Sequence, residues 1–194
     1  MRTTLIISTA LVAAWIAWMA WPLAALYGLA RAVEARDVPA VMQNVNVVSV
    51  YRYLTDQIVG SYEQATGTSA HHNALSAMIT TSILDPLVAG MITPEKFVTM
   101  LHDGWVDSSL VERPPDARGL SRRALGGWWQ AFLASEQDFD RYSISFPTVK
   151  PMEQRFTLRF RLRAWRWQLR EVILPQDLRN RLARTLAKQQ PPRR

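Results

Sequence analysis

The sequence contains no cysteine and only three histidines among its 194 residues. The absence of cysteine excludes a disulfide scaffold, thiolate-bound zinc, iron–sulfur ligation and a cysteine nucleophile. It does not identify the redox compartment, because a chain without thiols is stable on either side of a membrane. A glycine-rich phosphate loop, a His-Glu-x-x-His pair and a Gly-x-Ser-x-Gly turn are also missing. We therefore expect no catalytic residues, no metal site, no cofactor and no enzymatic activity.

Charge is missing from the start of the chain, where residues 3–30 include no Asp, Glu, Lys or Arg. These 28 residues would form a helix of about 42 Å, longer than the ~30 Å hydrocarbon core of a bilayer. Pro22 divides the run, and the 19 residues before it match one span at roughly 28 Å. We expect a transmembrane helix over residues 1–21 and a second helix that begins at Pro22.

Two other interpretations of this segment are a cleaved secretory signal and a buried core helix. The one Ala-x-Ala site, at residues 30–32, lies past the apolar run, and a core helix would need protein on every side. An uncleaved signal anchor is therefore favoured, with the following domain in the periplasm by default, since flanking positive charges barely discriminate. The residues expected at the membrane interface are Arg2, Trp15, Trp18 and Trp21.

The positive charge is confined to the last quarter of the chain. Residues 1–149 carry a net charge of −3 and residues 150–194 a net charge of +10. Apolar and polar side chains alternate over residues 142–146, 156–162 and 165–169, with a turn expected near Arg163 and Ala164. This pattern predicts a three-stranded antiparallel meander, followed by a short basic amphipathic helix and a loose tail.

Arginines and aromatic residues alternate in the last two expected strands, so they lie on opposite faces of the sheet. This separation argues against nucleic acid as a partner, because stacked bases need rings beside a cationic groove. A solvated sheet face is one interpretation of the arginines, and contact with anionic lipid headgroups is the other. The candidate ligand or lipid contacts are Trp165, Trp167, Arg159, Arg161 and Arg163.

The middle of the chain is typical of helices. Asn46 is expected to cap one helix, and Thr93-Pro94 to begin another that ends at Asp103-Gly104. A loop is expected over residues 66–73, a helix over 75–84 that restarts at Asp85-Pro86, a long loop over 105–120, and a helix over 122–133 weakened by Gly126-Gly127. Helices first and strands last predict an α+β fold with a helical first half, a small antiparallel sheet and a carboxyl-terminal helix.

Other polar groups offer weaker chemistry. His71-His72 is expected to be a solvated pair, and Glu136, Asp138 and Asp140 to form a solvated turn rather than a calcium site. Glu171 would fall on the apolar side of its strand unless a bulge rotates it outward or an arginine pairs with it. His102-Asp103 resembles an acid–base dyad, although the helix dipole equally explains a cation there.

Several segments resemble a bacterial family known as domain of unknown function 2939. They are Leu26-Tyr27-Gly28-Leu29 through Ala35-Arg36-Asp37, Asp85-Pro86-Leu87-Val88 with Thr93-Pro94-Glu95, Phe139-Asp140-Arg141-Tyr142, and Trp167-Gln168-Leu169 through Leu174-Pro175. The resemblance implies an envelope location and an α+β domain, and it supplies no activity or site residues. The Arg-rich final hairpin and the basic extension after Pro175 depart from the family's pattern.

These observations divide the chain into a transmembrane anchor over 1–21, an α+β domain over 22–175 and a basic helix with a tail over 176–194. They favour a binding or interaction module of the cell envelope, anchored by a single pass in the bacterial inner membrane. Its expected partner is an anionic lipid or an envelope protein. The alternative is an envelope hydrolase that uses carboxylates and His102.

Overall fold

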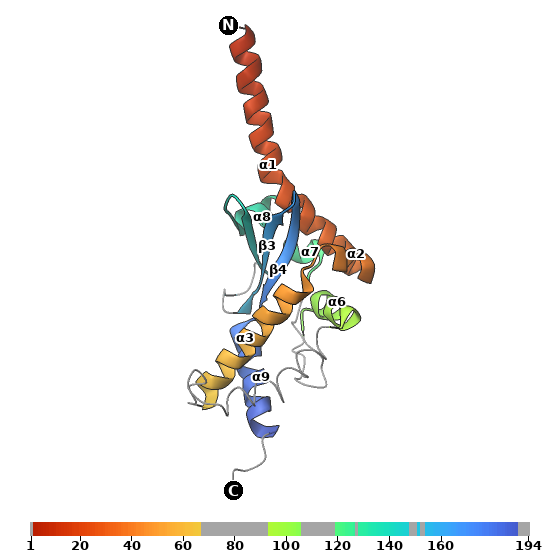
Figure 1. Cartoon of the computed structure of the whole chain (residues 1–194), viewed down its shortest axis with the longest axis vertical. Helices are drawn as coiled ribbons and strands as arrows, with labels where there is room; N and C mark the ends of the chain where they lie inside the picture. Colours follow the sequence, from red (N-terminus) through yellow and green to blue (C-terminus); the bar gives the residue numbers. More distant parts are fainter. Residues whose placement is uncertain are drawn as a thin grey trace.

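A computed structural model describes residues 2–66, 93–105, 119–126, 128–147, 151 and 154–189. The fold is α+β, as the sequence predicts (Figure 1). The helices are α1 (Arg2–Glu34), α2 (Val38–Gln43), α3 (Val47–Thr66), α6 (Pro94–Asp103), α7 (Arg122–Leu125), α8 (Trp128–Leu133) and α9 (Gln176–Gln189). The loop expected over 66–73, the helix over 75–84 with its restart at Asp85, His71-His72, and residues 106–118 lie outside the described residues.

Helix α1 is continuous from Arg2 to Glu34 with Pro22 inside it, so the prediction of a second helix beginning at Pro22 is wrong. Proline removes one backbone hydrogen bond and displaces the carbonyl four residues earlier, which bends a helix without having to end it. Figure 1 shows α1 changing direction where it reaches the sheet. The leucines that follow, Leu23, Leu26 and Leu29, are buried, and this packing holds the second half of the helix in place.

The predicted caps of the later helices are confirmed. The Asn46 side chain accepts a hydrogen bond from the Ser49 N–H at 3.0 Å, and the Thr93 hydroxyl accepts one from the Lys96 N–H at 3.4 Å. Helix α6 ends at Gly104, whose φ of 65° only glycine adopts without a Cβ penalty. The helix expected over 122–133 is broken into α7 and α8 at Gly126, which has a φ of 70°.

Within the described part of the chain the sheet has four strands in the order β1-β2-β3-β4, every pair antiparallel, so the predicted meander has one strand more than expected. The strands are β1 (Ser135–Gln137), β2 (Arg141–Phe146), β3 (Phe156–Arg163) and β4 (Arg166–Ile173). Strand β2 stops before Pro147, as predicted. Beyond β4, Val45 forms a bridge to Leu169 and extends the sheet by one short segment.

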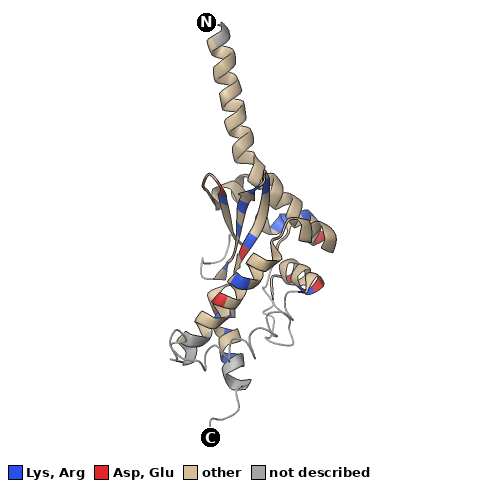
Figure 2. Ribbon diagram, in the orientation of Figure 1, with Lys and Arg blue, Asp and Glu red and all other residues tan. Residues whose placement is uncertain are grey.

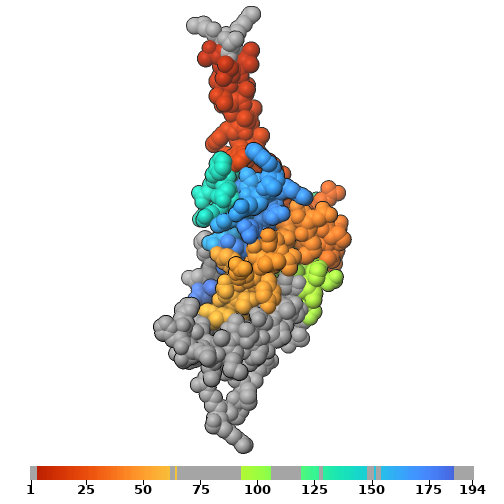
Figure 3. All heavy atoms as spheres, in the orientation of Figure 1, coloured from red at the N-terminus to blue at the C-terminus, as the bar shows by residue number. Residues whose placement is uncertain are grey.

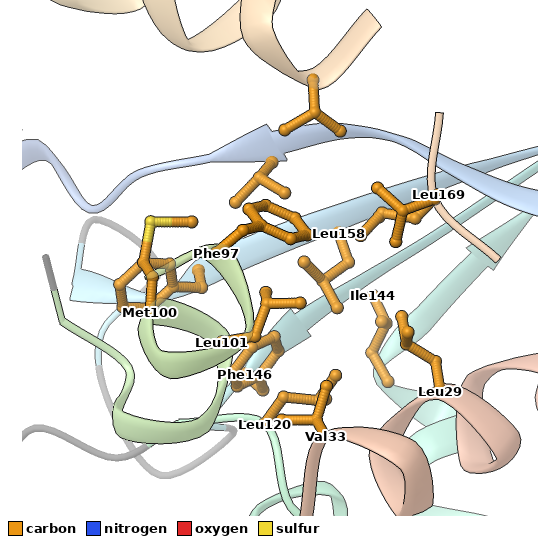
Figure 4. Packing of buried hydrophobic residues seen from close by; sticks show 14 of the residues in the cluster. Leu29, Val33, Phe97, Met100, Leu101, Leu120, Ile144, Phe146, Leu158 and Leu169 are labelled. Carbon is orange, nitrogen blue, oxygen red and sulfur yellow. The ribbon is translucent and has the colours of Figure 1, made fainter. Parts of the chain in front are cut away.

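The core lies between one face of the sheet and the helices. Figure 4 shows Leu29 and Val33 of α1 and Phe97, Met100 and Leu101 of α6 against the strand residues Ile144, Phe146, Leu158 and Leu169. Helix α3 packs along β4 and against α9, where Leu178 and Leu182 are buried. The apolar stripe of α9 is therefore used inside the fold, while Arg181 and Arg184 are exposed.

Candidate functional site

The first half of α1 stands clear of the rest of the molecule (Figure 3). Its large apolar side chains, which include Leu5, Leu11 and Trp15, are 56–67% exposed. Figure 2 shows no charged residue along the part of this segment that is not grey. The helix is long and apolar enough to cross a membrane. One rigid element thus joins an exposed apolar rod to a buried core segment.

Four aromatic rings gather where α1 meets the sheet, and we call them the aromatic collar. Trp18 stacks on Phe139 with 5.3 Å between ring centroids, and Trp21 stacks on Trp165 at 6.1 Å. Trp18 and Trp21 also meet edge to face at 6.0 Å. Phe139 lies in the β1–β2 turn and Trp165 in the β3–β4 turn, so both hairpin tips touch the helix. Phe139 is nevertheless 80% exposed and Trp165 73% exposed.

The two tryptophans expected in the last strand, Trp165 and Trp167, lie in different parts of the hairpin, Trp165 in the β3–β4 turn and Trp167 in β4. The turn is formed by Ala164 and Trp165, one residue later than predicted, with φ angles of 49° and 59°. Trp165 therefore projects from the tip instead of from the sheet. Trp167 is 3% exposed and lies in the core against Tyr142. Of the two candidate contacts, Trp165 is therefore exposed at a hairpin tip and Trp167 is buried in the core.

One face of the sheet carries arginines, and we call the set Arg141, Arg161, Arg163 and Arg166 the arginine face. Arg141 lies directly opposite Arg161, and Arg163 directly opposite Arg166. Like charges in such cross-strand positions repel each other and destabilise a sheet. Arg141 has an exposed contact with Asp140 at 3.8 Å, and no ion pair joins Arg161, Arg163 or Arg166 to another described residue.

Arg159, the remaining candidate on this face, is neutralised. The pairing register shifts between Arg159 and Phe160, which leaves Arg170 as the extra residue of a bulge in β4. The shift turns Glu171 to the arginine side, where its carboxylate accepts a hydrogen bond from Arg159 at 3.1 Å. Both alternatives offered for Glu171 therefore occur together. The arginines of this face with no ion pair to another described residue, Arg161, Arg163 and Arg166, lie toward the end of the sheet nearest α1's exposed half.

Four buried side-chain atoms lack a hydrogen-bond partner among the described residues, and two of them, the Tyr142 hydroxyl and the Trp167 indole N–H, belong to aromatic residues of the core. Their rings meet edge to face with 6.4 Å between centroids. Burial raises the pKa of Tyr142 to about 12, because a phenolate would lose its hydration there. These side chains contribute apolar packing at the cost of unsatisfied polar atoms.

The remaining sequence candidates have ordinary surroundings. His102 and Asp103 do meet, with 2.7 Å between Nδ1 and Oδ1, but they are neighbours at the end of α6. Glu136 lies in β1, and Asp138 and Asp140 are exposed in the turn that follows it. Within the described ranges no three acidic or histidine residues come together as a metal site. The side chain of Arg2 lies outside the described residues.

A comparison with protein families finds one match, described as "Protein of unknown function (DUF2939)", over residues 11–100. The match confirms the family assignment for this segment, while the resemblance at residues 139–142 and 167–175 lies beyond it. No curated protein and no solved structure matches the chain.

Proposed function

With residues 11–100 belonging to the DUF2939 family, we propose that the protein is a single-pass membrane-anchored module that binds anionic lipid headgroups beside its own anchor. The observation that carries the proposal is the division of α1. Its first half is apolar and exposed, and its second half, from Leu23 to Val33, is part of the domain core. A domain that shares one helix with its anchor is held close to the membrane surface.

Charged substitutions in the exposed half of α1 test the anchor without disturbing the core. Ile7 and Leu11 are 60% and 66% exposed, so Ile7→Arg with Leu11→Arg removes no packing from the domain. Each arginine in the middle of a span costs about 2.5–3.5 kcal/mol on insertion scales. We expect the double variant to leave the membrane fraction on alkaline extraction, while the matched Ile7→Ala, Leu11→Ala variant stays. Retention of the arginine variant would contradict a membrane span.

The arginine face supports lipid as the partner over a protein, because it lies at the end of the sheet from which the anchor leaves. Arg163 and Arg166 flank the turn whose tip stacks on Trp21 of α1. Anionic headgroups attract basic residues near the surface by about 1 kcal/mol each. The same negative charge would offset the repulsion between opposed arginines.

Native mass spectrometry of the full chain from nanodiscs of mixed phosphatidylglycerol and phosphatidylcholine tests this partner. Arg163→Gln with Arg166→Gln should lower retained phosphatidylglycerol by roughly thirtyfold if each arginine supplies ~1 kcal/mol. The control removes the same charge from α9, as Arg181→Gln with Arg184→Gln, and should retain it. Equal retention by both variants would exclude the arginine face as the binding surface.

The proposed location is the bacterial inner membrane with the domain in the periplasm, and the family resemblance together with the anchor support it. A protease added to spheroplasts should digest the domain and leave an anchor fragment. Digestion only after rupture of the inner membrane would place the domain in the cytoplasm instead.

A second candidate function, an envelope hydrolase, has one observation in its favour, the 2.7 Å contact between His102 and Asp103. The contact equally suits a histidine at a helix carboxyl end. Unchanged phenotype or activity in His102→Ala and Asp103→Asn would remove this candidate.

A further inference from the structure

We infer that the tips of both hairpins, at Phe139 and Trp165, lie in the lipid headgroup layer and fix the domain upright on the bilayer that α1 crosses. The inference rests on the proposed anchor and extends it, because the anchor alone holds the domain close to the membrane without deciding which of its loops contact the lipid. Here the aromatic collar gives the protein a second, peripheral membrane contact.

The length of the anchor places the collar at the membrane boundary. Trp18 follows Arg2 by sixteen residues, or about 24 Å of helix, and Trp21 follows it by about 28 Å. The hydrocarbon core is ~30 Å thick. A charged residue stays near the opposite surface, so Trp18 and Trp21 cannot rise clear of the headgroups. Phe139 and Trp165 stack directly on them and must lie at the same level.

The chemistry of the β3–β4 turn supports the same conclusion. Two-residue hairpin turns with positive φ at both positions favour Asn-Gly, because other side chains are strained there. This turn has Ala164 and Trp165 at φ of 49° and 59°. Trp165 gains little burial in return, since it is 73% exposed. A tryptophan placed at a sterically costly and exposed position suits the membrane interface, where an amphipathic indole is stabilised.

The groups around the two tips favour contact with the lipid headgroup layer over contact with a second protein. Helix α8 lies at the same end of the sheet (Figure 1) and carries exposed Trp129 and Leu133. Asp138 and Asp140 flank Phe139, so that tip can reach the headgroups but not the hydrocarbon core. The surface is also continuous with the apolar half of α1, which a bilayer would cover in any case.

Because the chain has no cysteine, single cysteines labelled with a nitroxide can report depth in the intact protein. Asp138→Cys and Ala164→Cys place probes beside Phe139 and Trp165 and keep both aromatic rings. Leu11→Cys is the probe inside the membrane. Gln176→Cys is the aqueous control, since it follows the other end of β4, about 26 Å of strand from the turn. Each variant is reconstituted in phosphatidylglycerol–phosphatidylcholine vesicles, and collision rates with oxygen and with a water-soluble nickel chelate are compared.

We expect the probes at 138 and 164 to collide with the nickel chelate several-fold less than the probe at 176, and with oxygen less than the probe at 11. Equal nickel accessibility at 138, 164 and 176, with the probe at 11 still protected, would overturn the inference and leave the anchor intact. An accessible probe at 11 would instead refute the anchor. Protection at 138 and 164 from both reagents, with dipolar coupling between labels, would assign the surface to a second copy and also overturn the lipid contact.

Discussion

Replacing the β3–β4 turn by the residues that its backbone favours should stabilise the protein while weakening its contact with lipid. The perturbation is Ala164→Asn with Trp165→Gly, at the two positions with φ of 49° and 59°. The left-handed conformation costs about 1–2 kcal/mol for a residue with a Cβ, and glycine pays none of it. Asparagine adopts this conformation more readily than alanine does.

The same double substitution also removes the stacking of Trp165 on Trp21, whose ring centroids are 6.1 Å apart, and this lowers stability. Such pairs contribute about 0.5–1.5 kcal/mol beyond their buried area, and the area that Trp165 buries is small. The gain at two positions therefore exceeds the loss of one stack, and the net change in the free energy of unfolding should be an increase of about 1 kcal/mol.

Urea unfolding of the full chain in detergent micelles, followed by circular dichroism, measures this change. Trp165→Ala is the matched control, because it loses the stack and keeps the costly backbone, and it should lower the free energy of unfolding by about 1 kcal/mol. In vesicles, a label at 138 should become more exposed to water in the Asn-Gly variant. A variant less stable than the parent protein would refute the assignment of the turn as a site of strain.

Three further substitutions test the packing of the fold. Between pH 10 and about 12 the buried Tyr142 phenol stays neutral while the phenol of the unfolded chain ionises, so the free energy of unfolding falls as the pH rises. Tyr142→Phe should remove this part of the loss. Urea unfolding at each pH measures it, and an unchanged dependence of stability on alkaline pH would contradict the prediction. Gly119→Ala should destabilise the fold by several kcal/mol, because the added Cβ would collide with the His102 carbonyl. Gly60→Ala, in helix α3, places its Cβ in open space and should stabilise the fold by up to ~1 kcal/mol. Thermal unfolding of both variants measures these changes.

Three helix boundaries and three of the strands follow from local patterns in the sequence, whereas the expected helix start at Pro22 and the unbroken helix over 122–133 do not occur. Asn46 and Thr93 begin their helices and Gly104 ends one through contacts within a few residues, so the sequence alone contains the signal. Alternation over β2, β3 and β4 works for the same reason. Strand β1 is not predicted, because its three residues are all polar and show no alternation of apolar and polar side chains.

The errors near the site have one origin, which is that single residues decide orientation in a sheet. Moving the turn by one residue takes Trp165 from the strand to the tip, and the bulge at Arg170 reverses the direction of Glu171. The collar itself joins Trp18 to Phe139, more than a hundred residues later in the chain. No periodicity links these positions, so only the folded structure brings them together.

The opposed arginines at the end of the sheet nearest α1's exposed half lead to a last prediction. At the other end of β4 polar groups are satisfied: Gln57 donates a hydrogen bond to the Val172 carbonyl at 2.8 Å and accepts one from the Leu174 N–H at 2.9 Å. Arg163 and Arg166, by contrast, repel each other across the hairpin. Polar groups are therefore paired at one end of β4, whereas two arginines face each other at the other end. The requirements of folding do not explain why Arg163 and Arg166 are opposed.

Arg166→Glu separates folding from binding at this pair. It replaces repulsion by attraction to Arg163 and should raise the free energy of unfolding by about 0.5 kcal/mol in micelles free of anionic lipid. Arg166→Gln removes only the repulsion, so its free energy of unfolding should lie between those of the parent protein and Arg166→Glu. Phosphatidylglycerol retained from nanodiscs should follow the opposite order, with the parent protein highest. If stability and retention rise together, then the arginines serve the fold and lipid is not what offsets their charge.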